Sequence, residues 1–300
     1  MKILIYGAGV IGSLYAVYLS RAGYSISVLA RGNRLETLKN KGLLYFDKSK
    51  NIRKSDVTVI SNLEANDYFD YIFLTVREEH LKPALESLAD NCSPTIVTMV
   101  NSIVPYSQWE QLCGAGRILP AFPGAGGGII NDVLDAALTP RFIQPTTFGE
   151  INGTVTYRIQ KLERIFHKAG IPTQIIPDMH AWQICHLAMV VPIADAYYMT
   201  DKPECVYRNR KIMKHTAKSL HDGFIQLKHL GIDISPIKMN IFRFCPTVII
   251  AAILPLVYHS QFGNRFMYQH AIKAKNEMKE LHSQLYRLLK EEKGEQHDEI

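Results

Sequence analysis

The segment KILIYGAGVIGSLYAVYLSRAGYSISVLAR, residues 2–31, decides the fold of the first half of this 300-residue chain. It reads as a short apolar strand, a glycine turn, a helix and a second strand. Gly7, Gly9 and Gly12 form the pattern GxGxxG between the first strand and the helix. In that setting the first glycine allows a tight turn, the second lets backbone approach a diphosphate, and the third lets the helix pack on the strand.

This turn is therefore predicted to bind a dinucleotide. The N-terminus of a helix presents free N–H groups and the positive end of its dipole to phosphate oxygens. A flavin or S-adenosylmethionine is an alternative ligand for the same pattern, and a plain turn without a ligand is the remaining interpretation. The predicted contact residues are Gly7, Ala8, Gly9, Val10, Ile11 and Gly12.

The end of the second strand discriminates between the two nicotinamide dinucleotides. A site for NAD usually carries Asp or Glu there, to bind the ribose 2′-hydroxyl. This chain has VLARGNR at residues 28–34, with Arg31 in that place and Arg34 nearby. Guanidinium groups attract a 2′-phosphate, so the predicted cofactor is NADPH or NADP⁺.

The rest of the chain predicts two domains. YIFLTV (71–76) and TIVTMV (95–100) are further strand-like runs, with the helical pattern LKPALESLAD (81–90) between them. Strands that alternate with helices predict a doubly wound, Rossmann-type parallel sheet. From Pro177 onward nearly all patterns are helical, so we expect a dinucleotide-binding domain over residues 1–176 and an all-helical substrate or dimerisation domain over residues 177–300.

Charge and cysteine content restrict the partners. The net charge of +6 comes from scattered Lys and Arg without an aromatic-basic motif, which favours a small anionic ligand over nucleic acid. Five cysteines without CxxC spacing predict free thiols, no metal site and a cytoplasmic protein. FCPTVIIAAILPLVY (244–258) is short for a membrane span and contains two prolines, so we expect a buried helix or a homodimer contact.

On these motifs the sequence resembles the ketopantoate reductase (2-dehydropantoate 2-reductase) family. The resemblance covers the N-terminal domain and reaches into the first C-terminal helix. FLTVREEHL (73–81) is similar to a family strand that ends in Lys, and Arg77 holds that place. VTMVNSIVP (97–105) is similar to a strand followed by Asn-Gly. Asn101 matches the Asn near nicotinamide and substrate, and Ser102 replaces the glycine. AFPGAGGG (121–128) is interpreted as either a loop by the active site or a surface turn.

The resemblance implies NADPH-dependent reduction of ketopantoate, a reaction of pantothenate biosynthesis. The family's catalytic helix carries Lys, Asn and Asn at four-residue spacing before a Pro. Alignment on Pro192 places Gln183, Leu187 and Val191 at these positions. The Ser and Glu that hold substrate near the family's C-terminus have no counterpart here.

A carbonyl that receives hydride needs a hydrogen-bond donor and then a proton. Gln183 has an N–H donor but no transferable proton, whereas His186, on the same face one turn later, can supply one. The alternative for His186 is a satisfied core residue. Asn101 ends a strand on the ligand-binding edge. Arg77 is predicted to clamp a substrate carboxylate, bind a cofactor phosphate or face solvent.

Three hypotheses follow. The first is an NADPH-dependent oxidoreductase that acts on a small 2-oxo acid or related anionic carbonyl. The second is a catalytically silent NADP(H)-binding sensor, motivated by the missing polar residues on the helix. The third is an opine-type dehydrogenase, which joins a similar sheet to a helical domain and uses His as acid and base.

Overall fold

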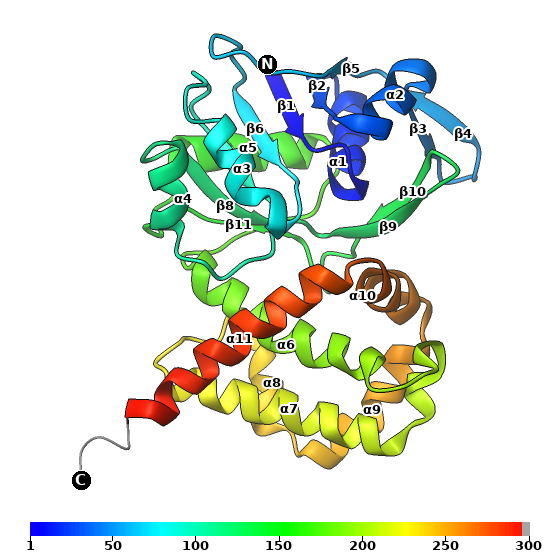
Figure 1. The fold of residues 1–300 in the computed structure, drawn as a ribbon, viewed down its shortest axis with the longest axis vertical. Coiled ribbons are helices and arrows are strands. Elements are labelled where there is room, and N and C mark those ends of the chain that lie inside the picture. Colours follow the sequence, from blue (N-terminus) through cyan, green and yellow to red (C-terminus); the bar gives the residue numbers. More distant parts are fainter. Residues whose placement is uncertain (296–300) are drawn as a thin grey trace. The chain divides into compact units, whose positions relative to one another are not determined.

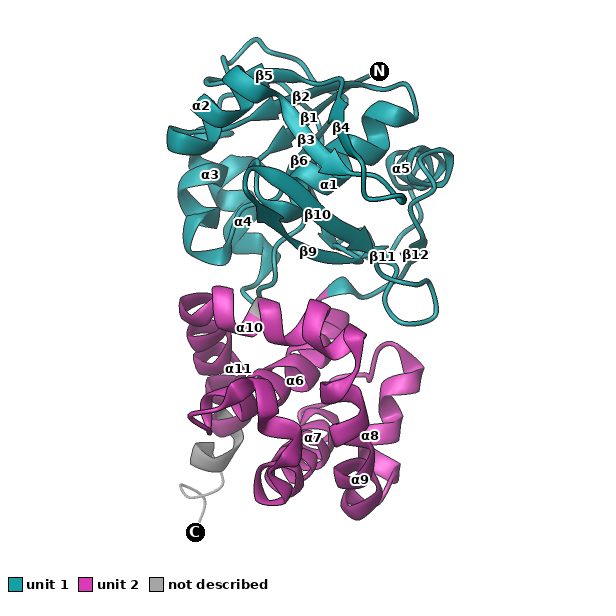
Figure 2. Cartoon of the chain, turned by 90° about the vertical axis from the view of Figure 1, so that its right-hand side faces the viewer, with its two compact units in different colours: residues 1–179 teal, residues 180–300 magenta. Residues whose placement is uncertain are grey.

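The computed structural model describes residues 1–295 and divides the chain into two compact units, Met1–Met179 and His180–Ile300 (Figure 2). The first unit combines sheets and helices, and the second is helical over its described residues. The expected fold class, a largely parallel α/β sheet followed by a helical region, is confirmed.

The main sheet of unit 1 has eight strands in the order β12-β11-β8-β7-β6-β1-β2-β5 (Figure 1). All neighbours pair in parallel except β8 and β11. The strands are β1 (Lys2–Tyr6), β2 (Ser25–Leu29), β5 (Thr58–Ile60), β6 (Tyr71–Leu74), β7 (Ile96–Thr98), β8 (Ile118–Phe122), β11 (Thr146–Phe148) and β12 (Thr173–Ile175).

The direction of winding reverses at β1. The chain runs from β1 to β2 on one side, while β6 lies against the other side, with Ile3 opposite both Ile26 and Tyr71. In a doubly wound sheet, ligands bind in the crevice outside the carboxyl ends of the strands at this reversal. The turns that follow β1, β6 and β7 are therefore the part of unit 1 to search for a site.

Helices cover this sheet and bury its central strands. Ile3, Leu4 and Ile5 of β1 have no exposed surface, as a strand covered on both faces requires. The helices are α1 (Val10–Arg21), α2 (Gly32–Lys41), α3 (Leu81–Ser87), α4 (Tyr106–Cys113) and α5 (Tyr157–Lys168). Phe166 of α5 lies at the centre of an aromatic cluster, with ring centroids 5.8 Å from Tyr15, 5.6 Å from Phe73 and 5.7 Å from Phe148.

A second sheet of four strands was not predicted, and it corrects one interpretation. Its order is β4-β3-β10-β9, and β9 includes Gly126, Gly127 and Gly128 of the run AFPGAGGG. From Ala125 onward the run is therefore a strand and not a loop or a turn, because β9 pairs with β10 along its whole length and packs with it against α1. The strands are β3 (Leu43–Phe46), β4 (Ile52–Ser55), β9 (Ala125–Ile130) and β10 (Val133–Leu138).

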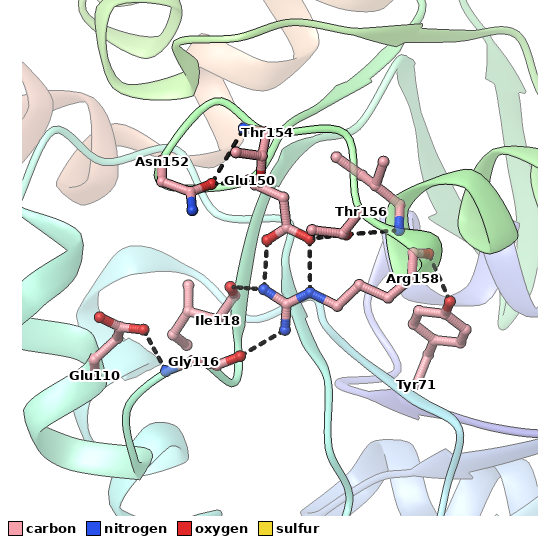
Figure 3. A network of polar contacts seen from close by, with 10 residues as sticks. Tyr71, Glu110, Gly116, Ile118, Glu150, Asn152, Thr154, Thr156 and Arg158 are labelled. Carbon is pink, nitrogen blue, oxygen red and sulfur yellow. Dashed lines mark hydrogen bonds and ion pairs between the residues drawn. The ribbon is translucent and has the colours of Figure 1, made fainter.

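An ion pair ties α5 to the strands beneath it (Figure 3). Arg158 donates to both oxygens of Glu150, at 2.8 Å from Nε and 2.5 Å from Nη2, and to the carbonyls of Gly116 and Ile118 at 2.6 and 3.1 Å. Thr156, which caps α5, donates a further bond to Glu150. Burial would raise the pKa of the Glu150 carboxyl, but the bonds from Arg158 and Thr156 outweigh it and hold this pKa below its ordinary value.

Unit 2 is built from helices joined by short turns. Its longest helices in the described chain are α6, α7 and α11, and α6 contains Pro192. No helix among the described residues is long and apolar enough to cross a bilayer. The α-helices are α6 (Met179–Tyr198), α7 (Arg210–His229), α8 (Ile241–Phe244), α9 (Thr247–His259), α10 (Gln269–Lys273) and α11 (Lys275–Glu295). Between them lie the short 3₁₀ helices η2 (Pro203–Arg208) and η3 (Ile237–Asn240) and the π-helix η4 (Gly263–Tyr268).

The Glu150–Arg158 pair generates a prediction about stability. Arg158→Met leaves a carboxylate that is 5% exposed without its cation, so we expect the free energy of unfolding to fall by about 3 kcal/mol at neutral pH. The pair stabilises the fold above the ordinary Glu pKa, and this contribution is lost as pH falls through the lowered folded-state value. The difference in free energy of unfolding between the Arg158→Met variant and the native chain, measured by urea unfolding, should therefore become smaller at acidic pH.

The matched control is Arg164→Met, which removes an exposed cation from the same helix and should leave stability within about 0.5 kcal/mol of the native value. The double variant Glu150→Gln with Arg158→Met should recover at least half of the loss, because no uncompensated charge remains. Equal losses in the single and the double variant would contradict this account of the pair.

Candidate functional site

The turn after β1 is the first part of the candidate site. Gly7 adopts φ +112°, a backbone conformation that side chains disfavour, and its N–H donates to the carbonyl of Leu29 at 3.2 Å. The chain then enters α1 at Val10, with Gly9 at the N-cap. The geometry of this turn is set by backbone, and it brings the helix start to the carboxyl end of β1.

Close contact between backbones holds the turn in place. A Cβ added at Gly12 would lie 2.0 Å from the Gly7 carbonyl oxygen and 2.4 Å from Oγ1 of Thr75, so there is no room for a side chain. Thr75, directly after β6, donates from Oγ1 to the Gly7 carbonyl at 2.8 Å and from its N–H to the Tyr6 carbonyl at 2.9 Å. Sequence reasoning missed Thr75, although a hydroxyl residue at the end of the strand next to β1 was a usable signal.

Gly9 differs from Gly12, because it faces open space. A Cβ built there meets nothing within 4 Å, and the residue is exposed, while Val10 and Ile11 are partly exposed and Ala8 is buried. The N–H groups of the first helical turn have no carbonyl within their own helix to bond, and α1 has no acidic residue in that turn. A diphosphate fits this position, because it can approach the backbone at Gly9 and accept from these amides.

Two arginines lie beside the turn. Arg34 of α2 donates from Nε to the Ala8 carbonyl at 3.1 Å and from Nη2 to Oγ of Ser13 at 3.3 Å. Burial lowers the pKa of the Arg34 guanidinium and the nearby Asp132 carboxylate opposes this shift; an arginine remains charged at neutral pH. Arg31, at the N-cap of α2, is exposed and donates from Nη2 to the Tyr6 hydroxyl at 3.0 Å.

The Tyr6 hydroxyl that accepts from Arg31 also forms a second hydrogen bond. It lies 2.8 Å from Oγ of Ser87, which itself donates to the Ala84 carbonyl at 2.8 Å. Since the Ser87 proton is used in that bond, Ser87 accepts from Tyr6, and Tyr6 accepts from Arg31. The bonds thus run in one direction, from the guanidinium through a buried phenol to α3.

The next two parallel strands bring Arg77 and Asn101 to the same edge of the sheet. Arg77 follows β6 and is 53% exposed, with a single long contact of 3.9 Å between Nη1 and the Glu79 carboxylate. Asn101 follows β7, and its side-chain oxygen Oδ1 is buried. Among the residues that the structure describes, none donates a hydrogen bond to this oxygen. A buried acceptor without a donor is costly, and it suits a ligand that brings an N–H.

The predicted catalytic helix is α6 of unit 2. Gln183 has no exposed surface and His186 is 7% exposed, and they lie three residues apart on the helix. The imidazole of His186 stacks on the indole of Trp182, with ring centroids 5.1 Å apart and an interplanar angle of 7°. Leu187 and Val191 are buried apolar residues. The stacked indole fixes the orientation of the imidazole plane.

The five cysteines are free thiols. Over residues 1–295, no three His, Cys, Asp or Glu side chains lie together in a group that could hold a metal ion.

The chain is similar to proteins named as reductases or oxidoreductases. Residues 3–133 match the family model described as ketopantoate reductase PanE/ApbA. A 2-dehydropantoate 2-reductase of Mesorhizobium japonicum is 28% identical over 207 residues, which are 60% of this chain and 61% of the relative. The uncharacterized oxidoreductase YkpB of Bacillus subtilis is 27% identical over 187 residues, 60% of this chain and 58% of the relative. The matches thus span about three fifths of these curated relatives.

Solved structures share the fold over nearly the whole chain. A putative ketopantoate reductase from Ralstonia solanacearum superposes with a TM-score of 0.67 at 15% identity, covering 97% of this chain and 98% of the other. A ternary structure of D-mandelate dehydrogenase with NADH and anilino(oxo)acetate gives 0.61 at 12% identity, covering 97% and 99%. Neither the silent sensor nor the opine-type dehydrogenase is favoured by these likenesses.

The two environments of Gly9 and Gly12 make a paired prediction. Gly12→Ala forces the turn or Thr75 to move, so we expect a loss of about 3 kcal/mol in the free energy of unfolding. Gly9→Ala should change the free energy of unfolding by less than about 1 kcal/mol, because its φ of −72° suits alanine while alanine is a poorer N-cap than glycine. The Gly9 variant should nevertheless bind NADPH about tenfold more weakly, since the methyl group occupies the space open to a diphosphate.

Thermal unfolding and titration calorimetry on both variants check this prediction. If the Gly9→Ala variant binds NADPH as tightly as the native chain, the glycine turn is not part of the binding site.

Proposed function

We propose that the chain is an NADPH-dependent oxidoreductase that reduces the carbonyl of a small 2-oxo acid. The premise is that residues 3–133 are a ketopantoate reductase PanE/ApbA family domain. Ketopantoate is the first substrate to test, because curated relatives carry the name 2-dehydropantoate 2-reductase. The bound cofactor would supply the hydride. The residues of this chain would bind the cofactor, orient the substrate and deliver the proton.

One observation carries the choice of NADPH. Arg31 and Arg34 lie beside the glycine turn, at the end of β2 where a NAD site places a carboxylate. Arg34 is committed to the Ala8 carbonyl and holds the turn, whereas Arg31 is exposed and has guanidinium N–H groups left to donate. Arg31 would bind a ribose 2′-phosphate, and the positive charge of Arg34 would attract the same phosphate.

The edge of the sheet supports the binding of a nicotinamide and a carboxylate. Oδ1 of Asn101 is a buried acceptor that a carboxamide N–H would satisfy. Arg77 is half exposed and its one contact to Glu79 is long, so its guanidinium is available for a bidentate bond to a substrate carboxylate. Both residues would position the reactants rather than exchange protons.

The chemistry at the carbonyl falls to α6. Negative charge develops on the oxygen during reduction, and the Gln183 amide is proposed to donate a hydrogen bond to it. His186 is proposed to be the proton donor, since an imidazole titrates near neutrality and this one is held against Trp182. Together they would replace the lysine that the family uses, with polarisation and protonation divided between two side chains.

The cofactor assignment predicts a selective loss. Arg31→Ala removes charge-assisted bonds to the 2′-phosphate, so we expect NADPH affinity to fall about 30-fold. NADH has no 2′-phosphate, so its affinity should change less than about threefold. Titration calorimetry with both nucleotides measures the ratio. Lys39→Ala, which removes an exposed cation elsewhere on α2, is the control and should leave both affinities unchanged.

Equal losses for NADPH and NADH would show that Arg31 does not read the 2′-phosphate. A native chain that binds neither nucleotide would overturn the proposed function.

The role of His186 predicts a separation of binding from turnover. His186→Ala should lower kcat with the best 2-oxo acid by about 100-fold or more, the range for loss of a positioned general acid. The affinity for NADPH should stay within about twofold, because the nucleotide turn belongs to unit 1. Stopped-flow absorbance of NADPH gives the rate, and titration calorimetry gives the affinity.

The control is His229→Ala, an exposed histidine at the end of α7, which should leave kcat unchanged. A His186→Ala chain with native kcat across the pH range would remove His186 from catalysis. If the native protein binds NADPH but reduces no member of a broad 2-oxo acid panel, the proposal that it is an oxidoreductase is wrong.

A further inference from the structure

A cavity of about 190 Å³ lies in unit 2, lined by residues of the helices α6, α7 and α11 that Figure 1 labels. Its wall consists of small or apolar residues that are buried, and its mouth of polar residues that are partly exposed. We refer to this space as the α6–α7–α11 cavity. The wall residues are Ala188, Pro192, Gly223, Leu285 and Leu289. The mouth residues are Ser219, Asp222, Gln226 and Tyr286.

Gly223 makes room for this cavity from within α7. The residue is buried, yet a Cβ built on it meets no neighbouring atom of the described chain within 4 Å. Glycine inside a helix destabilises that helix relative to alanine, and protein interiors contain few spaces larger than a water molecule. A buried helical position with room for a side chain, beside a partly polar mouth, is the shape of a small-ligand site.

The volume of the cavity limits the size of its ligand. A protein cavity of roughly 150 Å³ holds one benzene molecule. The α6–α7–α11 cavity is somewhat larger, so it fits a molecule of about six to nine non-hydrogen atoms. Its wall suits an apolar ring or short chain, and its mouth suits one polar group.

The residues at the mouth favour a cation over an anion. Asp222 supplies a carboxylate, and among the described residues that line the cavity none is Lys, Arg or His. Ser219, Gln226 and Tyr286 add neutral oxygens that can accept hydrogen bonds. An ammonium group carries three donors and a positive charge, so it matches this set, whereas a ligand carboxylate would be repelled by Asp222.

The wall provides a further acceptor. Pro192 lies inside α6 and has no N–H, so it cannot donate the helix bond that the carbonyl of Ala188, four residues earlier, would otherwise accept from it. Both residues line the cavity. The Ala188 carbonyl thus has acceptor capacity that a ligand N–H can use.

The existing partner of Asp222 is easily displaced. Nζ of Lys218 lies 2.7 Å from Oδ2 of Asp222, one turn along α7, and the Lys218 side chain is 71% exposed. Exposed pairs at this spacing contribute little to stability. A cation seated in the cavity can therefore compete with Lys218 for the carboxylate.

We propose that the α6–α7–α11 cavity binds a small primary amine, with the apolar body of the ligand against Gly223 and its ammonium group at Asp222. The lining residues all belong to unit 2, and among those described neither Gln183 nor His186 is included. The inference therefore goes beyond the proposed reaction and does not depend on it.

The first test compares three probes of one shape and different charge. Benzylamine, benzyl alcohol and benzoate are titrated into the native protein, with ligand-observed NMR as the measurement. Benzylamine should bind with a Kd on the order of 1 mM, as expected for a ligand of this size. Benzyl alcohol should bind at least tenfold more weakly, and benzoate should not bind.

The second test changes the cavity. Gly223→Leu fills the space and should weaken benzylamine binding at least 30-fold. Gly223→Ala adds one methyl group, should weaken binding about threefold and should raise Tm by about 2 °C, so it keeps the test usable if the leucine variant does not fold. Asp222→Asn should weaken benzylamine binding about tenfold and leave benzyl alcohol binding unchanged.

The matched control is Asp201→Asn, which removes an exposed carboxylate from the same unit and should leave benzylamine binding unchanged. Every variant should keep its NADPH affinity, because the nucleotide turn belongs to unit 1, so a failed cavity and a failed cofactor site are distinguishable. The proposal is wrong if benzylamine does not bind, or if benzoate binds more tightly than benzylamine. Unchanged benzylamine affinity in a folded Gly223→Leu or Asp222→Asn variant would also overturn it.

Discussion

The structure of unit 1 depends on one close contact, in which α1 at Gly12 meets the turn after β1 with no room for a side chain at position 12. The Gly7 carbonyl, Gly12 and the Thr75 hydroxyl occupy this point together. The contact fixes the angle at which the helix leaves the sheet, and so it fixes where the free amides of the helix point.

The strands of the main sheet could be predicted because they are buried on both faces and read as short apolar runs. The second sheet could not. Its β4 strand, IRKS, is mostly polar and exposed, and β9 contains three successive glycines, so neither shows the alternation that marks a strand. These segments are strands because of their partners: β10 lies between β3 and β9, and both β9 and β10 pack on α1. Such pairing between distant segments leaves little local signal.

The candidate site divides in the same way. A spacing of three glycines, followed by an arginine where an acid is usual, was enough to predict a glycine turn between β1 and α1, and the structure has that turn. Coordinates were needed to see that Thr75 bonds to the Gly7 carbonyl, that Arg34 bonds to the Ala8 carbonyl, and that the exposed Arg31 bonds to Tyr6. For α6 the sequence provided residue types only, and the stacking of His186 on Trp182 is a fact of packing that spacing suggests but does not establish.

The one-way hydrogen bonds from Arg31 through Tyr6 to Ser87 have an evolutionary consequence. A site for NADH usually has an acidic residue at the position of Arg31. Its carboxylate would compete with Ser87 for the hydrogen bond that the Tyr6 hydroxyl donates. If Tyr6 donated to that carboxylate, Ser87 would have to donate to Tyr6, and the carbonyl of Ala84 would lose the hydrogen bond from Ser87. With Arg31 in its proposed role, a change of coenzyme would therefore need a compensating substitution at position 6 or 87 in addition to the one at position 31.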